Sequence, residues 1–155
     1  DRHVSALDDF QTWFQAFETC VADDGWDRLL PLLAEHCEYR VIGVPFACTL
    51  RGRQALVAGF ARSIANFDRR FEDRLHIAAR TRVLDANTVR YEACTVYRTH
   101  FLPPLACAAT EDLHFARGRL ELIVDHYDAD IVQNQNALAW LERHAAALGL
   151  DPAYG

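Results

Sequence analysis

The sequence contains no lysine and no methionine, and all 16 of its basic residues are arginines. No apolar run approaches the ~18 residues that a membrane-spanning helix needs. No basic segment followed by an apolar one stands near the start, so no signal peptide is predicted. The formal net charge is -6 and there is no dense basic run, which disfavours nucleic acid or an anionic membrane as the main partner.

The cysteines are odd in number and widely spaced, and no C-x-x-C pair occurs. We interpret them as reduced thiols of a cytoplasmic protein. His36 and Cys37 are adjacent, but no second pair stands at ligand spacing, so no metal site is predicted. The sequence has no glycine-rich phosphate loop and no nucleophile elbow, and it predicts no cofactor. The five cysteines stand at positions 20, 37, 48, 94 and 107.

The length of 155 residues suits a single domain, 1–155, with a sizeable core. Hydrophobic residues make up 51% of the chain and charged residues 25%, a mixture typical of a soluble globular protein. The sequence has no internal repeat, no low-complexity tract and no interdomain linker.

Helical spacing of apolar residues predicts three helices in the first half of the chain. The first begins with a capping box of Ser5 and Asp8 and has an aromatic face. The second contains Pro31, which is tolerated in a first turn. The third begins at Gly52. Their apolar sides are Leu7, Phe10, Trp13, Phe14, Phe17 and Val21, then Leu29, Leu30, Leu32 and Leu33, then Leu56, Val57, Phe60, Ile64 and Phe67.

A last helix at about 130–148 follows the strands. Asp130 is its expected N-cap, and Gly149 with Pro152 ends it. This helix is an addition at the C-terminal end of the domain.

Alternating apolar and polar residues predict strands between the third and the last helix. From Arg74 to Val83, the alternation favours a strand whose apolar side is buried. Thr88–Thr99 follows after a turn, and Leu105–Ala116 and Arg119–Asp128 form a hairpin. Its turn is Arg117-Gly118, where glycine supplies the positive φ. The expected buried sides are Leu75, Ile77, Ala79, Thr81 and Val83, and then Tyr91, Ala93, Thr95 and Tyr97.

A further strand precedes the third helix, at Glu38–Val44, and Pro45–Arg51 is a loop or a short edge strand. Helices that precede a run of strands are typical of an α+β fold. We expect a long, curved antiparallel sheet with helices packed on its concave face. The interior of such a cone is a natural pocket.

Four features resemble the nuclear transport factor 2-like superfamily, and its SnoaL-like branch in particular. They are the aromatic first helix, Gly25–Ala34, Leu50–Leu56, and Phe115–Leu120 followed by Asp125 to Asp128. The similarity covers about residues 5 to 130. It implies a cone-shaped α+β barrel with a deep apolar pocket, usually a homodimer through the outer sheet face. Relatives include isomerases, polyketide cyclases, dehydratases, epoxide hydrolases and proteins that only bind.

The resemblance implies an acid/base Asp on the last strand and a polar residue on the preceding strand, as in the SnoaL-like cyclases. Asp125 and Glu111 match these two places. Proton abstraction beside a carbonyl needs a carboxylate with a raised pKa and a donor for the enolate oxygen. Tyr97, Tyr127 or His100 are further candidates for the donor, and Tyr97 completes our catalytic set. The ketosteroid isomerase pattern fits less well. It requires an acid where Val41 stands and a tyrosine where Trp13 stands.

The two sides of the last strand are ambiguous. Simple alternation from Leu120, Leu122 and Val124 sends Asp125 outward and His126 inward. The resemblance instead places Asp125 inside, which requires a β-bulge or burial of both faces. Glu111 shares the parity of Leu113 and Phe115, so periodicity and resemblance agree that it lies inside.

We therefore expect a pocket for a small apolar or aromatic molecule. Two hypotheses remain open. One is a cofactor-free isomerase, cyclase or dehydratase that acts on an apolar carbonyl compound. The other is a non-catalytic module that binds a ligand or a partner in the same cone. The expected ligand-binding residues are Trp13, Phe17, Tyr39, Phe60, Leu113 and Tyr127.

Overall fold

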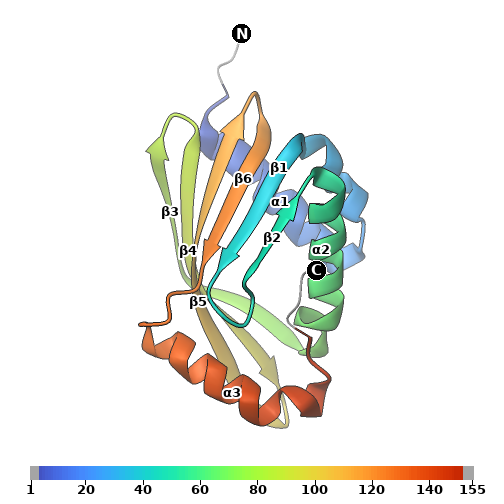
Figure 1. Ribbon diagram of the computed structural model, residues 1–155, viewed down its shortest axis with the longest axis vertical. Coiled ribbons are helices and arrows are strands. Elements are labelled where there is room, and N and C mark those ends of the chain that lie inside the picture. Colours follow the sequence, from blue (N-terminus) through green and yellow to red (C-terminus); the bar gives the residue numbers. More distant parts are fainter. Residues whose placement is uncertain (1–3, 152–155) are drawn as a thin grey trace.

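The computed structural model describes residues 4–151 and consists of one curved sheet with helices around it (Figure 1). Along the chain the elements are α1 (Ala6–Asp23), the 3-10 helix η1 (Trp26–Leu32), β1 (Leu33–Ile42), β2 (Cys48–Arg51), α2 (Arg53–Asn66), the 3-10 helix η2 (Asp68–Arg70), β3 (Asp73–Asp85), β4 (Thr88–Thr99), β5 (Leu102–Ala116), β6 (Arg119–His126) and α3 (Val132–Leu148).

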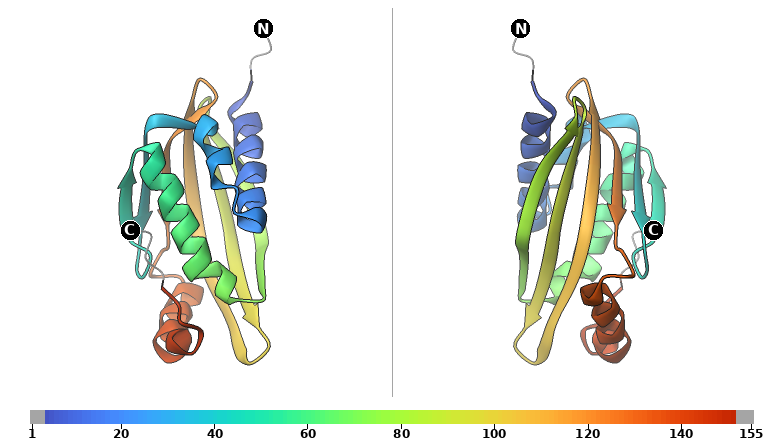
Figure 2. Two further views of the ribbon diagram at one scale, coloured as in Figure 1. Left: turned by 90° about the vertical axis from the view of Figure 1, so that its right-hand side faces the viewer. Right: turned by 90° about the vertical axis from the view of Figure 1, so that its left-hand side faces the viewer.

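The sheet has six strands in the order β2-β1-β6-β5-β4-β3. All neighbouring strands are antiparallel except β1 and β6, which are parallel. The helices α1 and α2 pack on the concave side, as Figure 2 shows in two side views. The expected α+β cone is therefore confirmed.

The first helix begins as predicted. Ser5 Oγ accepts a hydrogen bond from the backbone of Asp8 at 3.2 Å, and Asp8 Oδ2 accepts one from the backbone of Ser5 at 3.2 Å. This reciprocal capping satisfies two backbone donors that the helix cannot pair itself. Phe10 and Trp13 are buried against the sheet. The aromatic face of α1 thus forms one wall of the cone.

The predicted second helix is wrong in type and extent. Residues Trp26–Leu32 form a short 3-10 helix, and only Trp26 and Leu29 in it are buried. Leu33 is fully buried as the first residue of β1, which begins five residues earlier than the alternation from Glu38 suggested. Pro31 has no backbone N–H, so it cannot support a longer helical ladder.

The predicted buried side of β3 is wrong along the whole strand. Beyond the middle of the strand, Ala79, Thr81 and Val83 are exposed. In the first half the facing itself is reversed, because the strand contains a β-bulge. Ile77 pairs with Cys94 but Arg80 pairs with Glu92, so β3 has one extra residue there, and Ala78 has a φ of 52°. A bulge reverses the alternation of side chains. Leu75 and Ile77 consequently point outward and are 41% and 49% exposed. Arg74 and His76, expected in solvent, point into the cone.

A second bulge settles the facing of β6. His114 pairs with Leu122 and Phe115 pairs with Leu120, which leaves Glu121 as the extra residue. Beyond the bulge, Asp125 points to the concave face of the sheet and is 6% exposed, whereas His126 is exposed. The bulge that the resemblance required is present.

The strand β5 begins at Leu102, before the predicted start at Leu105, and so includes Pro103 and Pro104. Leu102 pairs with Thr99 of β4, while no strand lies on the other side, because β6 ends opposite Thr110. A proline on such a free edge removes no hydrogen bond of the ladder.

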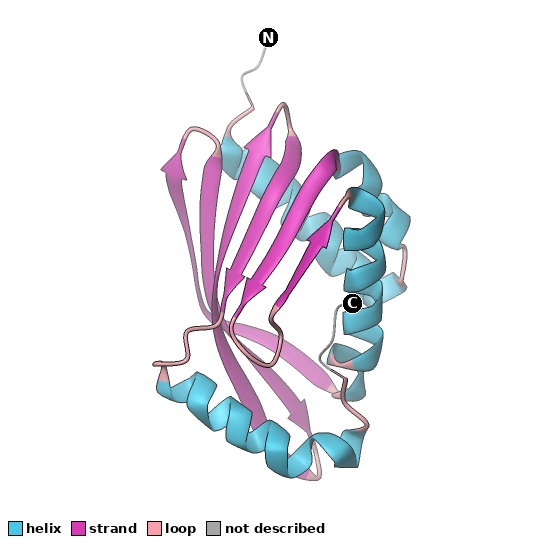
Figure 3. Cartoon of the chain, in the orientation of Figure 1, coloured by secondary structure: helices cyan, strands magenta, loops and turns pink. Residues whose placement is uncertain are grey.

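The helix α3 covers that free edge. Figure 3 shows β3, β4 and β5 continuing beyond β1 and β6, with α3 lying across the extension. The Asn134 amide binds both the N–H and the C=O of Ala108, at 2.8 and 2.9 Å, and Trp140 Nε1 donates to the Pro103 carbonyl at 2.9 Å. The N-cap is Ile131 rather than the expected Asp130, and Gly149 ends the helix as predicted.

No helix in the described part of the chain is long and apolar enough to cross a membrane. The five cysteines are all free thiols.

The loop after β1 passes unusually close to the end of β6. Gly43 has a φ of +109°, and a Cβ built on it would lie 2.3 Å from the Tyr127 carbonyl oxygen. Tyr127 N donates to the Ile42 carbonyl at 2.8 Å at the same crossing. Only glycine permits this approach.

Replacing Gly43 by alanine should therefore destabilise the protein by more than about 2 kcal/mol, because steric overlap adds to the cost of the left-handed conformation. Gly149→Ala is the matched control. Gly149 also has a positive φ, but a Cβ built on it would lie 3.8 Å from its nearest neighbour, an Arg70 nitrogen. Urea unfolding of both variants measures the difference. Equal losses of unfolding free energy in the two variants would contradict the proposed steric overlap at Gly43.

Candidate active site

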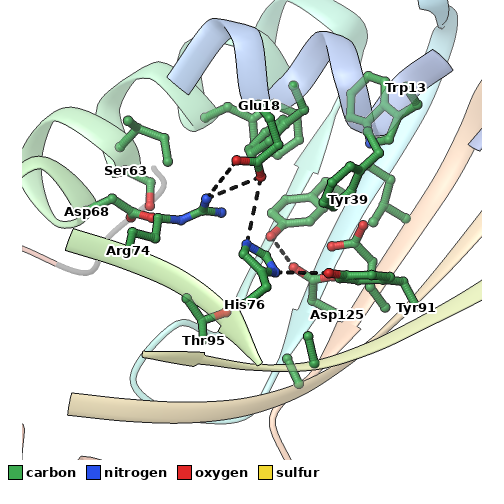
Figure 4. A pocket seen from close by; sticks show the side chains of 18 of the residues that line it. Trp13, Glu18, Tyr39, Ser63, Asp68, Arg74, His76, Tyr91, Thr95 and Asp125 are labelled. Atoms are coloured by element: carbon green, nitrogen blue, oxygen red, sulfur yellow. Dashed lines mark hydrogen bonds and ion pairs between the residues drawn. The ribbon is translucent and has the colours of Figure 1, made fainter. Parts of the chain in front are cut away.

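A cavity of about 120 Å³ lies inside the cone between α1, α2 and the inner face of the sheet (Figure 4). Aromatic side chains form much of its wall. Trp13 and Phe17 come from α1, Phe60 from α2 and Tyr39 from β1, and the Phe17 and Phe60 rings meet edge to face at 5.3 Å. The remaining wall contains an unusual number of ionisable groups.

Three neighbouring strands place one row of polar residues across the cavity. Tyr91 on β4 is opposite Glu111 on β5, which is opposite Asp125 on β6. Directly paired residues on one face have Cβ atoms about 4.5–5.5 Å apart. Tyr39 Oη, from β1, donates a hydrogen bond of 2.5 Å to Asp125 Oδ2. The carboxyl groups of Glu111 and Asp125 are therefore neighbours within a mostly aromatic enclosure.

Burial and mutual repulsion favour a proton on this pair when the protein is folded. Burial raises the pKa of Glu111 well above its usual range, and the Asp125 charge raises it further. Burial also raises the pKa of Asp125, but hydrogen bonds from Glu111 and Tyr39 oppose that rise. Asp125 Oδ1 is buried, and the described residues offer it no donor unless Glu111 is protonated. Glu111 is thus the acid of the pair and Asp125 the carboxylate.

The two carboxyl groups differ in their access to the cavity. Asp125 is 6% exposed and has one oxygen bound to Tyr39. Glu111 is only partly buried as a residue, and its carboxyl group lies within the walls of the cavity. Glu111 is therefore the member of the pair that a ligand in the cavity can reach more readily.

A second group of charges lies on the other side of the cavity. Arg74 Nε is 2.7 Å from Asp68 Oδ2, and Arg74 Nη1 is 3.1 Å from Glu18 Oε2. His76 Nδ1 lies 3.1 Å from Tyr91 Oη, and His76 Nε2 is 3.8 Å from Glu18 Oε1. Figure 4 shows these contacts as a chain from Glu18 through His76 to Tyr91. Tyr91 therefore connects this second group to the carboxyl pair.

Burial sets the protonation of this group. It raises the pKa of Asp68 to about 6, against the opposing effect of Arg74. It lowers the pKa of His76, and the Arg74 charge lowers it further, while Glu18 acts in the other direction. At neutral pH His76 is therefore uncharged.

Neither a protein-family model nor a curated protein matches the sequence. Solved structures do match the fold. A nuclear transport factor 2-like protein from Burkholderia xenovorans is 15% identical, and the similarity covers 88% of this chain and 98% of that chain with a TM-score of 0.65. The chain has the nuclear transport factor 2-like fold.

Two further structures with this likeness bear enzyme names. A candidate polyketide cyclase from Xanthomonas campestris is 17% identical and covers 88% of this chain and 99% of its own, with a TM-score of 0.60. An LEH-like epoxide hydrolase from M. tuberculosis is 15% identical. The similarity covers 88% of this chain and 94% of that chain, with a TM-score of 0.57. At these identities the nuclear transport factor 2-like fold is established, and any activity has to be argued from the residues of the site.

Most of the predicted ligand-binding residues line the cavity of this fold, but Leu113 does not. Leu113 is fully buried and packs in the core. His100 lies outside the cavity, where it contacts Glu72 at the surface. The predicted residues in the lining are Trp13, Phe17, Tyr39, Phe60 and Tyr127, together with Glu111, Asp125 and Tyr97 of the catalytic set.

Tyr97 lines the cavity but stands far from the carboxyl pair. It lies six residues along β4 from Tyr91, about 20 Å on an extended strand. Its ring packs against Phe67 and Phe71 at 5.3 and 5.1 Å. Tyr39 and Tyr91, rather than Tyr97, are the phenols beside the pair.

The sequence reasoning missed Glu18, Asp68, Arg74, His76 and Tyr91 as site residues. One signal was available, because Glu18 follows Phe14 by four residues and so lies on the aromatic face of α1. Arg74 and His76 were hidden by the bulge in β3. Among the described residues, no group of three or more His, Cys, Asp or Glu side chains could hold a metal ion.

The raised pKa of Asp68 predicts a pH dependence of stability. A carboxyl whose folded pKa is about 6, against 3.8 unfolded, stabilises the fold fully below pH 3.8, and this contribution is lost as pH rises through 6. Relative to Asp68→Asn, the wild type should lose about 2 kcal/mol of unfolding free energy between pH 4 and pH 7.

Urea unfolding of both proteins at several pH values measures this difference. The exposed Asp27→Asn variant controls for the removal of one acidic charge. A wild type and an Asp68→Asn variant with parallel pH profiles would show that Asp68 does not bind the extra proton.

Proposed function

We propose that this protein is a cofactor-free acid/base enzyme of the SnoaL-like type, an isomerase, cyclase or dehydratase, that acts on a small carbonyl compound. The main support is the buried Glu111–Asp125 pair, which shares one proton beside an aromatic cavity. Solved structures named as a candidate polyketide cyclase and a candidate isomerase have similar folds. A carboxyl pair with separated pKa values is a common source of both an acid and a base.

In this proposal Glu111 contacts the substrate and Asp125 sets its protonation. When the Glu111 proton moves onto Asp125, the Glu111 carboxylate can remove a proton from the carbon beside a carbonyl. The C–H electron pair then forms the new C=C bond, and the carbonyl oxygen becomes an enolate. Return of the proton to another carbon completes an isomerisation. Attack of the enolate on a second carbonyl, whose oxygen takes the proton from Glu111, gives a cyclisation. Departure of a neighbouring hydroxyl group, which takes the proton from Glu111 and leaves as water, gives a dehydration.

Tyr91 is the proposed donor to the enolate oxygen. It stands beside Glu111 in the sheet register. In the His76 tautomer with the proton on Nδ1, the ring donates to Tyr91 Oη at 3.1 Å, which leaves the phenol proton for the ligand. Burial raises the pKa of Tyr91, so it keeps its proton at neutral pH. A phenol held in this way can donate to a developing negative charge.

The size of the cavity favours a single-ring or comparably small substrate. Its volume of about 120 Å³ is somewhat less than the ~150 Å³ in which an engineered protein cavity accommodates benzene. The aromatic walls suit an apolar or aromatic body.

A non-catalytic binding module of the same fold is the alternative. Its support is the seclusion of Asp125, which has one oxygen bound to Tyr39 and the other buried. A pair of this kind can also fix the geometry of a ligand site without transferring protons.

Exchange of carbon-bound protons distinguishes the two functions without knowledge of the natural substrate. A panel of single-ring ketones and enones is incubated with the protein in D2O, and the loss of α-proton signals is followed by NMR. We expect exchange with at least one compound. Glu111→Gln and Asp125→Asn should lower its rate by about 100-fold or more, as expected for loss of a general base.

The control is Glu142→Gln, which removes an exposed carboxylate on α3. Absence of exchange in the wild type across the panel, or unchanged exchange in both pair variants, would leave the binding function as the better account.

We further propose that the protein is a homodimer through the outer face of the sheet. Leu75 and Ile77 are large apolar side chains exposed on the outer face of β3. A second copy of this chain would remove both from water. This surface follows from the bulge, since that distortion turns the two side chains outward.

Replacing Ile77 by aspartate should convert such a dimer to a monomer in sedimentation or light-scattering measurements. The control is Val83→Asp, at a residue that is 54% exposed and lies beyond the bulge on the opposite face. A monomeric wild type, or a dimer that persists in Ile77→Asp, would contradict this interface.

A further inference from the structure

We propose that the cavity selects a ligand with a protonated amine on a ring-sized apolar body, and that it rejects carboxylates. This inference deepens the proposed function by giving the charge of its substrate. It concerns equilibrium binding, so it can be tested independently of turnover.

The cavity lining contains four carboxyl groups and one guanidinium group. The acids are Glu18, Asp68, Glu111 and Asp125, and the base is Arg74. The acids therefore outnumber the base by four to one, and still by three to one when Glu111 keeps the proton that burial favours. A ligand cation would reduce this excess, and a ligand anion would increase it.

The positive charge of Arg74 is already engaged. Its Nε lies 2.7 Å from Asp68 Oδ2, and its Nη1 lies 3.1–3.2 Å from both Glu18 oxygens. The Arg74 side chain is 16% exposed, so water screens these contacts only weakly. With two carboxylates on it, Arg74 gives little attraction to a third one from a ligand.

The nearest other base adds no positive charge. His76 is partly buried among Glu18, Arg74 and Tyr91 and packs against the Phe14 ring. Burial and the Arg74 charge lower its pKa, although Glu18 opposes this. Its Nε2 is buried and has no hydrogen-bond partner among the described residues.

The carboxyl pair gives a separate indication of the same preference. Asp125 is 6% exposed, and its Oδ1 receives no hydrogen bond in the described structure apart from the one that a protonated Glu111 can give. A buried carboxylate with so few donors is stabilised by a nearby cation.

The aromatic walls suit the same ligand. Phe14 and Tyr91 lie with ring centroids 5.3 Å apart, and both rings are near Glu18, which is one helical turn beyond Phe14 on α1. The faces of such rings attract ammonium groups, and more strongly where water is excluded. Glu18 is the most exposed carboxylate of the second group, with 34% of its side chain accessible, so an incoming amine meets it first.

Three probes of similar shape test the charge preference: benzylamine, benzyl alcohol and benzoate. Their dissociation constants are measured at pH 7 by calorimetry or ligand-observed NMR with the full chain. We expect benzylamine to bind about tenfold or more tightly than benzyl alcohol, and benzoate to bind more weakly than both. The alcohol isolates the contribution of the aromatic walls.

Glu18→Gln should weaken benzylamine about tenfold and leave benzyl alcohol unchanged. Glu142→Gln, which removes one negative charge outside the cavity, should leave all three constants as in the wild type.

Equal binding of amine and alcohol, tighter binding of benzoate, or no binding of any probe would overturn this proposal. The same holds if Glu18→Gln and Glu142→Gln behave alike. If the amine preference is found but no ketone exchanges its protons, the ligand class stands as that of a binding protein and the enzymatic proposal fails. If a ketone exchanges its protons but amines are not preferred, the enzymatic proposal stands and the proposed ligand charge is wrong.

Discussion

Two carboxyl groups that share one proton inside a curved sheet are the central constraint on this site. An ionised carboxylate taken out of water costs several kcal/mol unless donors surround it. Here Tyr39 supplies one donor to Asp125, and the retained proton of Glu111 supplies the other. The same proton keeps Glu111 neutral among aromatic rings. Adjacent strands hold the pair together, so the sheet register determines the chemistry available to the cavity.

The fold was largely predictable because its signals are local. A capping box, an aromatic face on α1 and a glycine turn before β6 each predict an element from neighbouring residues, and their order indicates the nuclear transport factor 2-like fold. Glu111 was also predictable, since periodicity and resemblance agreed. The errors in which face a side chain takes arise where one residue is inserted into a ladder. Alternation cannot reveal a bulge, and it therefore misplaced His76 and left Asp125 ambiguous.

The second polar group could not be predicted because its members meet only in the folded chain. Glu18 comes from α1, Asp68 from η2 and Arg74 from β3, and no spacing in the sequence connects them. Their contacts join the helical wall of the cavity to the edge strand of the sheet. These charges also change the character of the cavity. A pocket expected to be apolar is lined by aromatic rings and acidic side chains together.

The Asn134 side chain has a consequence for how the protein behaves in concentrated solution. Where β6 ends, β5 would present unpaired backbone groups to any other chain, and such edges promote association between strands. The Asn134 amide occupies the N–H and the C=O of Ala108 just as a neighbouring strand would. The last helix therefore covers a strand edge, and a protein that lost it would expose that edge of the curved sheet to pairing with other chains.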